Sequence, residues 1–158
     1  MPVTPFHFGP GALGTVLFPR RLSFIVFMAA NVAIDVETAL NILRRQYPLH
    51  GFFHSFASVP LVTAAGALLA PPLWRALASL AGGRLAKDLP RSTAALSCLF
   101  ASVSHVILDA VMHPDAAPFS PWSPANPLLG AVGLGALHLA CAASGLAAAV
   151  VLKLRRPV

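Results

Sequence analysis

Residues 104–115 read Ser-His-Val-Ile-Leu-Asp-Ala-Val-Met-His-Pro-Asp, and they close an apolar segment that begins at Ser92 and has no formal charge before Asp109. In a helix, His105, Asp109 and His113 stand at i, i+4 and i+8 and therefore share one stripe. Imidazole and carboxylate groups one turn apart on a rigid helix can share a metal ion. The alternative interpretation is a helix end at which polar side chains emerge into water.

The composition of the whole chain indicates a membrane protein. The chain has 158 residues, of which 57% are hydrophobic and 10% are charged, whereas soluble domains carry about 25% charged residues. The net charge is +6, but the 11 basic residues stand in small clusters between apolar runs, which is typical of topology signals. A nucleic-acid-binding function has little support because no helix face is basic and no aromatic residues alternate with basic ones.

Five apolar segments follow one another along the chain. Residues 10–18 are long enough for only about half a hydrocarbon core, roughly 15 Å of helix, and we expect a half-depth helix there. We predict four transmembrane helices over residues 22–43, 49–74, 92–112 and 128–152, with Pro71 and Pro72 ending the second one. The segment between the last two, residues 114–127, is a proline-rich loop. The prediction is an all-α integral membrane bundle of four spans plus the short N-terminal half helix, forming a single domain over residues 1–158.

The basic residues predict how this bundle is oriented. If the connection between the second and third spans and the C-terminus are cytoplasmic, nine of the eleven basic residues lie inside, and only Arg44 and Arg45 lie outside. This arrangement follows the positive-inside rule. We expect a multi-pass protein of a bacterial inner membrane with a cytoplasmic C-terminus.

On that topology the ionisable residues gather at the extracytoplasmic level. Five of the six histidines and four of the five acidic residues fall in the outer half of the bundle. Ionisable groups at membrane depth are costly and usually face a partner or a cavity. We therefore predict a metal site with Asp35 and Asp109 as catalytic carboxylates, and the candidate ligands are His7, Asp35, His50, His54, His105, Asp109 and His113.

The remaining polar residues have simpler interpretations. Glu37 lies about 200° around the helix from Asp35, so we expect it to face away from the cluster. Asp115 is interpreted as a cap of the loop, or as a solvated residue in it. His138 stands alone in the fourth span and is predicted to be a packed histidine and not a ligand.

Several of these segments resemble one family. They are residues 4–11 (TPFHFGPG), the Asp35 helix, residues 50–55 (HGFFHS), residues 104–109 (SHVILD) and residues 118–124 (PFSPWSP). Together they resemble the membrane-bound metal-dependent hydrolases, an inner-membrane family described as related to a LexA-binding protein and distantly similar to zinc-dependent phospholipases C and S1/P1 nucleases. The resemblance implies an all-helical enzyme that cleaves phosphoesters with one or two divalent ions, and it implies the same seven ligands.

Mixed nitrogen and oxygen ligands suit zinc, so we expect one or two zinc ions that activate water for attack on a phosphoester. The expected substrate is an anionic membrane lipid, either a phospholipid or a polyprenyl phosphate. Arg44 and Arg45 are candidate substrate-binding residues because guanidinium groups bind phosphate with two parallel hydrogen bonds. The alternative is two solvated arginines at a helix C-terminus.

Two other classes of function stay open. The protein could be a structural subunit of a membrane complex, in which the polar cluster only holds helices together, or it could be a small transporter. The transporter interpretation lacks an inverted repeat. Metal content distinguishes these hypotheses, because a hydrolase of this kind needs a bound metal ion and a structural subunit does not.

Overall fold

The computed structural model describes residues 5–82 and 88–155, and all regular structure in these two ranges is helical. Four helices are long and apolar enough to cross a membrane: α2, α3 with the turn before it, α4 and α5. The predicted all-α membrane bundle of four spans and a short N-terminal helix is thereby confirmed, and the chain is a multi-pass membrane protein. In chain order, the elements are η1 (Pro5–His7), α1 (Phe8–Leu17), α2 (Phe24–Leu43), η2 (Phe52–His54), η3 (Phe56–Ser58), α3 (Val59–Leu80), α4 (Arg91–Met112) and α5 (Leu134–Leu154).

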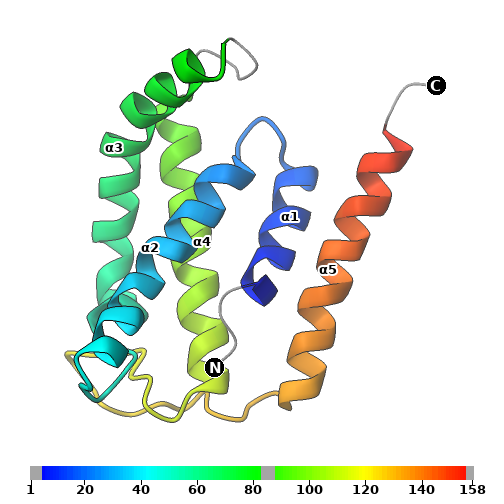
Figure 1. Ribbon diagram of the computed structural model, residues 1–158. Helices are drawn as coiled ribbons and strands as arrows, with labels where there is room; N and C mark the ends of the chain where they lie inside the picture. The colour runs from blue at the N-terminus through cyan, green and yellow to red at the C-terminus, as the bar shows by residue number, and fades with distance from the viewer. Residues whose placement is uncertain (1–4, 83–87, 156–158) are drawn as a thin grey trace.

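Helix α4 is the centre of the bundle. It packs extensively against both α2 and α3, whereas α2 and α3 contact each other much less. The short helix α1 packs mainly against α5 (Figure 1). The loop from α1 to α2 and the C-terminal end of α5 lie at one end of the bundle, and the loops from α2 to α3 and from α4 to α5 lie at the other (Figure 1).

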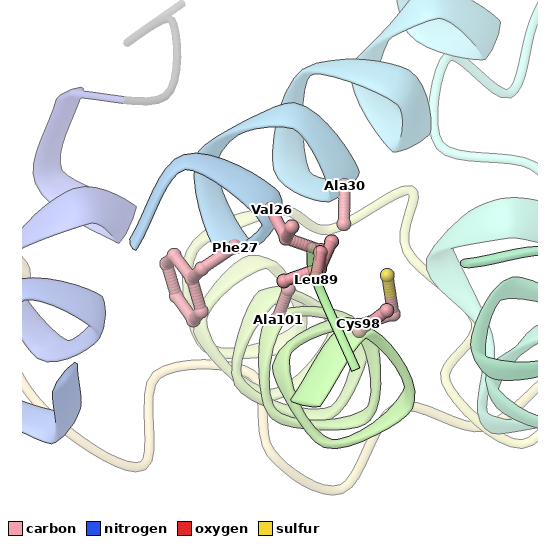
Figure 2. Close-up of a cluster of buried hydrophobic side chains, with 7 residues drawn as sticks. Val26, Phe27, Ala30, Leu89, Cys98 and Ala101 are labelled. Carbon is pink, nitrogen blue, oxygen red and sulfur yellow. The ribbon is translucent and has the colours of Figure 1, made fainter. Parts of the chain in front are cut away.

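The apolar core lies between α2 and α4. Figure 2 shows Phe27 and Ala30 of α2 close to Cys98 and Ala101 of α4. Ala101 is fully buried, and Phe27 is 1% exposed. Small side chains on α4 allow the backbones of the two helices to approach closely, and this close packing fixes the height at which polar residues further along each helix meet.

Gly9 permits a second close approach, between α1 and α5. A Cβ atom at Gly9 would overlap the backbone carbonyl group of Cys141 on α5. Arg155, just beyond the end of α5, adds a hydrogen bond of 2.6 Å from its Nη1 to the carbonyl oxygen of Val16. Glycine is therefore required where α1 crosses α5.

We expect Gly9→Ala to lower the stability of the protein by about 1–3 kcal/mol, the usual cost of overpacking, because a backbone atom of α5 cannot move aside as a side chain can. Thermal unfolding in detergent measures the effect. Gly135→Ala is the matched control, because a Cβ atom there would meet nothing within 4 Å. Equal stability of the two variants would contradict the close approach of α1 to α5.

The second span differs from its predicted bounds. It does not begin at residue 49, because residues 49–58 form two 3-10 turns and irregular backbone, and α3 starts at Val59 with Pro60 in its first turn. Nor does the span end at Pro71 and Pro72, since both lie inside α3, which continues to Leu80. Transmembrane helices tolerate internal proline because neighbouring groups satisfy the freed carbonyl groups.

The fourth span also starts later than predicted, at Leu134 instead of residue 128. Residues before it fold back on the end of α4: the backbone N–H of Gly130 donates to the carbonyl oxygen of Val111 at 3.0 Å, and the Asn126 amide donates to that of Ala110 at 2.8 Å. Gly130 has a φ of 69°, which glycine adopts without strain. These hydrogen bonds hold the proline-rich loop against the bundle.

Candidate metal centre

Asp109 is the carboxylate around which the polar cluster is built. It lies on the last turn of α4 and is 3% exposed. Its Oδ2 atom lies 3.1 Å from Nε2 of His105 and 3.4 Å from Nε2 of His54. Its Oδ1 atom lies 3.1 Å from Nε2 of His7 and 3.9 Å from Nε2 of His113. The two oxygens of one side chain therefore face two different sets of imidazoles.

The first set forms a group of four side chains from three segments. Asp35 of α2 places its Oδ1 atom 3.3 Å from Nε2 of His105 and 3.6 Å from Nε2 of His54. Together with Asp109, these residues offer ligand atoms that all lie within 4.8 Å of one another. Two imidazole nitrogens and two carboxylates at these separations could hold a metal ion.

A second group, of three side chains, shares Asp109 with the first. His50, Asp109 and His113 also bring one ligand atom each to within 4.8 Å of the others. The rings of His50 and His113 are stacked, with centroids 4.1 Å apart. A carboxylate common to both groups could bridge two ions.

His50 and His54 reach the cluster from a loop. We expected them on the first turn of a helix, but they lie in and before the 3-10 turn η2. The loop is held in place because the backbone N–H of Phe53 donates to Oε2 of Glu37 at 2.9 Å, and that of Phe56 donates to the carbonyl oxygen of Pro118 at 2.8 Å. These hydrogen bonds replace the helical ones, which explains why the helix begins only at Val59.

His113 also departs from the predicted helical stripe. It is the C-cap residue of α4, with φ −113° and ψ 120°, and is therefore outside the helix. The helix ends there because Pro114 disfavours helical backbone at the residue before it. His113 nevertheless lies in the second group, reached by an extended backbone and not by helical periodicity.

His7 completes the surroundings of Asp109. It is the N-cap residue of α1 and is 3% exposed. Its ring stacks on that of His105, with centroids 4.4 Å apart. It lies beside both groups of converging ligand atoms without belonging to either.

Three of the imidazoles are oriented by a second polar side chain. Nδ1 of His105 lies 2.9 Å from Oδ1 of Asn31, Nδ1 of His54 lies 3.3 Å from Oε2 of Glu37, and Nδ1 of His50 lies 2.9 Å from Oδ1 of Asp115. A hydrogen bond donated by Nδ1 fixes the tautomer and leaves Nε2 free to coordinate a metal. Nδ1 is thus held in all three rings, as it is in typical metal-binding histidines, and Nε2 of His54 also lies 3.3 Å from Oγ1 of Thr38.

Glu37 and Asp115 have roles that the sequence analysis did not predict. Glu37 was expected to face away from the cluster, but it contacts His54 from the side opposite Asp35, since the ring lies between the two carboxylates. Asp115 also accepts hydrogen bonds from the backbone N–H groups of Leu49 and His50. The sequence analysis missed these roles because both depend on where residues 49–54 lie, and it predicted a helix there instead of a loop.

The cluster carries excess negative charge. Burial opposes protonation of His54, but its hydrogen bonds with Asp35 and Glu37 and the charge of Asp109 outweigh burial and raise the pKa of His54 above its usual 6.5. For Asp115, burial favours the neutral acid, yet the hydrogen bond with His50 lowers the pKa of its carboxyl group below the ordinary value. A site with this charge attracts cations.

The buried nitrogen atoms fit a metal ion better than they fit hydrogen bonding alone. Nε2 of His105 and both ring nitrogens of His7 are buried without a hydrogen bond, although carboxylate oxygens lie 3.1 Å from each Nε2. These nitrogens lie close to carboxylate oxygens without hydrogen-bond geometry, an arrangement that ligands of a shared cation could also have. The donor set of imidazoles and carboxylates agrees with this interpretation.

The orienting carboxylate Asp115 gives a prediction. We expect Asp115→Ala to weaken metal binding by about 10–100-fold, because His50 loses the partner that fixes its tautomer. Isothermal titration with zinc measures the affinity. Asp88→Ala is the control, since Asp88 is an exposed carboxylate that pairs with Arg75. If the two variants bind zinc equally, Asp115 does not orient a ligand.

The predicted substrate-binding arginines lie at the same end of the bundle as the cluster. Arg44 is the C-cap residue of α2, and Arg45 follows with a φ of 54°. Both are exposed. The turn that they form leads into the loop that carries His50, and Asn41 fixes it by donating to the carbonyl oxygens of Pro48 and Leu49.

Comparison with known proteins finds no matching family model and no match among curated proteins or solved structures. The resemblance to membrane-bound metal-dependent hydrolases therefore stays a prediction from the quoted motifs. The site must be interpreted from its own geometry.

Proposed function

We propose that the protein is a membrane-bound metal-dependent hydrolase that cleaves a phosphoester of a membrane lipid. The observation that carries the proposal is that Nδ1 of three imidazoles is held by a polar side chain, while Nε2 of His54 and of His105 lies 3.1–3.6 Å from the carboxylates of Asp35 and Asp109. Clusters that only hold helices together have no need of this arrangement. Two groups that share Asp109 agree with one or two ions, and zinc suits the ligands best.

A divalent ion held there would lower the pKa of a water molecule and neutralise charge on a phosphoryl oxygen. The protein's own residues supply the rest. His54, His105 and Asp109 are buried and rigidly packed, so they hold their positions during a reaction. Asp35 is the more exposed carboxylate, with 28% of its side chain accessible, so it is the one that a water molecule can reach.

The reaction balances with water as the only second reactant. The oxygen of water forms a bond to phosphorus, and the ester P–O bond to the leaving group breaks. Asp35 accepts the proton that the water loses and returns it to the leaving oxygen. Arg44 and Arg45 bind the anionic headgroup near the cluster.

The location of the basic residues supports an extracytoplasmic site. The described residues Arg20, Arg21 and Arg155 belong to the end of the bundle opposite the cluster (Figure 1), while the predicted inner residues Arg84, Lys87 and Arg156 lie outside the described residues. By the positive-inside rule, the basic end faces the cytoplasm of a bacterial inner membrane. The cluster then faces the outer leaflet, and the C-terminus is cytoplasmic.

The test is a panel of lipid phosphoesters in mixed micelles, including phosphatidic acid, phosphatidylglycerol and polyprenyl phosphate. We expect the zinc-loaded protein to hydrolyse at least one of them and the Asp109→Ala variant to hydrolyse none. His138→Ala is the control, because His138 of α5 belongs to neither group of converging ligand atoms and its ring packs on Phe6. Absence of turnover with zinc-, manganese- and iron-loaded protein alike would overturn the proposal.

The arginines give a separate prediction. We expect Arg44→Gln with Arg45→Gln to raise KM for an anionic lipid several-fold and to leave kcat nearly unchanged, because the charges act on binding. The effect should shrink at high salt, since both arginines are exposed. Arg20→Gln with Arg21→Gln, at the other end of the bundle, is the matched control. If the variant with both Arg44→Gln and Arg45→Gln has unchanged kinetics, these arginines do not bind the substrate.

A further inference from the structure

A cavity between α2 and α3 is a feature of the bundle that the proposed chemistry does not use. Its volume is about 420 Å³, within the range of ligand pockets. It exists because α4 packs against both α2 and α3 and holds them apart. The facing side chains are small where the two helices pass each other: Ala29 and Ala33 on α2, and Ala65 on α3.

The lining of the cavity is apolar along its whole length. It runs from Leu77, near the end of α3, to Val62 near its start, a distance of about 22 Å along the helix. Leu69 and Leu77 are more than half exposed, so the cavity is open at the side of the bundle. Because this side lies within the candidate spans, hydrocarbon and not water would enter it.

One end of the cavity is lined by chain neighbours of the candidate metal ligands. Ile34 and Phe53 line it, and they are the chain neighbours of Asp35 and His54, which belong to the first group of ligand atoms. The fold thus places a long apolar groove next to a cluster that could hold a divalent ion. With a divalent ion bound at the cluster, this arrangement would suit an amphiphile with one hydrocarbon chain and an anionic head.

We propose that the α2–α3 groove binds one hydrocarbon chain of the lipid substrate and places its phosphoester at the His/Asp cluster. The position of the phosphoester at the cluster rests on the proposed hydrolysis. Binding of the hydrocarbon chain in the groove does not depend on that reaction and can be tested separately. The enzyme then selects long-chain lipid phosphoesters over soluble ones. The side opening lets the chain enter from the bilayer without leaving hydrocarbon.

A substitution that fills the groove tests whether the enzyme selects long-chain substrates. The substrates are para-nitrophenyl hexadecyl phosphate and para-nitrophenyl ethyl phosphate, which differ only in the chain. We expect Ala65→Phe to lower the ratio of long-chain to short-chain kcat/KM by about tenfold or more, because several buried methylene groups lose their contacts. Ala64→Phe is the matched control, since Ala64 is exposed and does not line the groove. Equal ratios in both variants would overturn the inference.

A binding experiment separates this inference from the proposed function. A hexadecyl phosphate with a diazirine near the end of its chain is cross-linked to the wild-type protein in detergent, and the modified residues are found by mass spectrometry. We expect cross-links at Leu69 and Leu73 of α3, with loss of them in Ala65→Phe, even if no phosphoester is hydrolysed. Labels spread evenly over the exposed leucines of α5 would show that the chain does not bind in the groove.

Discussion

Asp109→Ala is expected to abolish metal binding at both groups of the cluster. One oxygen of this carboxylate faces His54 and His105, and the other faces His7 and His113. Removing it takes a ligand from each group and leaves the buried imidazoles without their shared negative charge. The stoichiometry of bound zinc, measured by equilibrium dialysis, should fall to near zero.

The contrast with His113→Ala makes this prediction specific. His113 belongs only to the second group, so we expect its loss to remove at most one ion and to preserve binding at the first group. His138→Ala should bind zinc like the wild type. If Asp109→Ala binds as much zinc as His138→Ala, the bridging role of Asp109 is wrong.

Asp35→Asn is expected to lower kcat for the lipid phosphoester by about 10²–10⁴-fold, the usual contribution of a positioned general base. Asparagine keeps an oxygen that can coordinate but cannot accept the proton of water. We therefore expect the zinc content to change much less than the rate. Pre-steady-state release of para-nitrophenol, with zinc measured on the same samples, separates the two effects.

A variant that loses zinc and rate in equal proportion would show Asp35 to be a ligand only. A variant with the rate of the wild type would remove Asp35 from the chemistry. Ala39→Ser is a suitable control, because Ala39 is an exposed residue of the same helix.

Composition predicted the fold because long apolar runs in a chain with few charges have only helices available to them in a bilayer. Composition was a poorer guide to the residues at which the helices begin and end. Hydropathy does not distinguish residues 49–58 from a helix, yet Glu37 and Pro118 take the hydrogen bonds of that segment. The same is true before Leu134, where Gly130 and Asn126 bond to the end of α4.

The residue types of the cluster were visible in the sequence, but their arrangement was only partly so. His105 and Asp109 meet through helical spacing, as expected. His50 and His54 have the same spacing, but they lie in a loop and meet the cluster without helical periodicity. The partners Asn31, Glu37 and Asp115 lie 74, 17 and 65 residues from the imidazoles that they orient, and no local pattern reveals a contact at such a separation.

The central claim is that the cluster holds a metal, and elemental analysis of the detergent-purified wild-type protein tests it most directly. The account predicts one or two equivalents of a transition metal, zinc first, which His138→Ala retains and Asp109→Ala loses. A protein that contains no metal, and still binds none after incubation with zinc and removal of the excess, would contradict the account and leave the cluster as a hydrogen-bonded contact between helices.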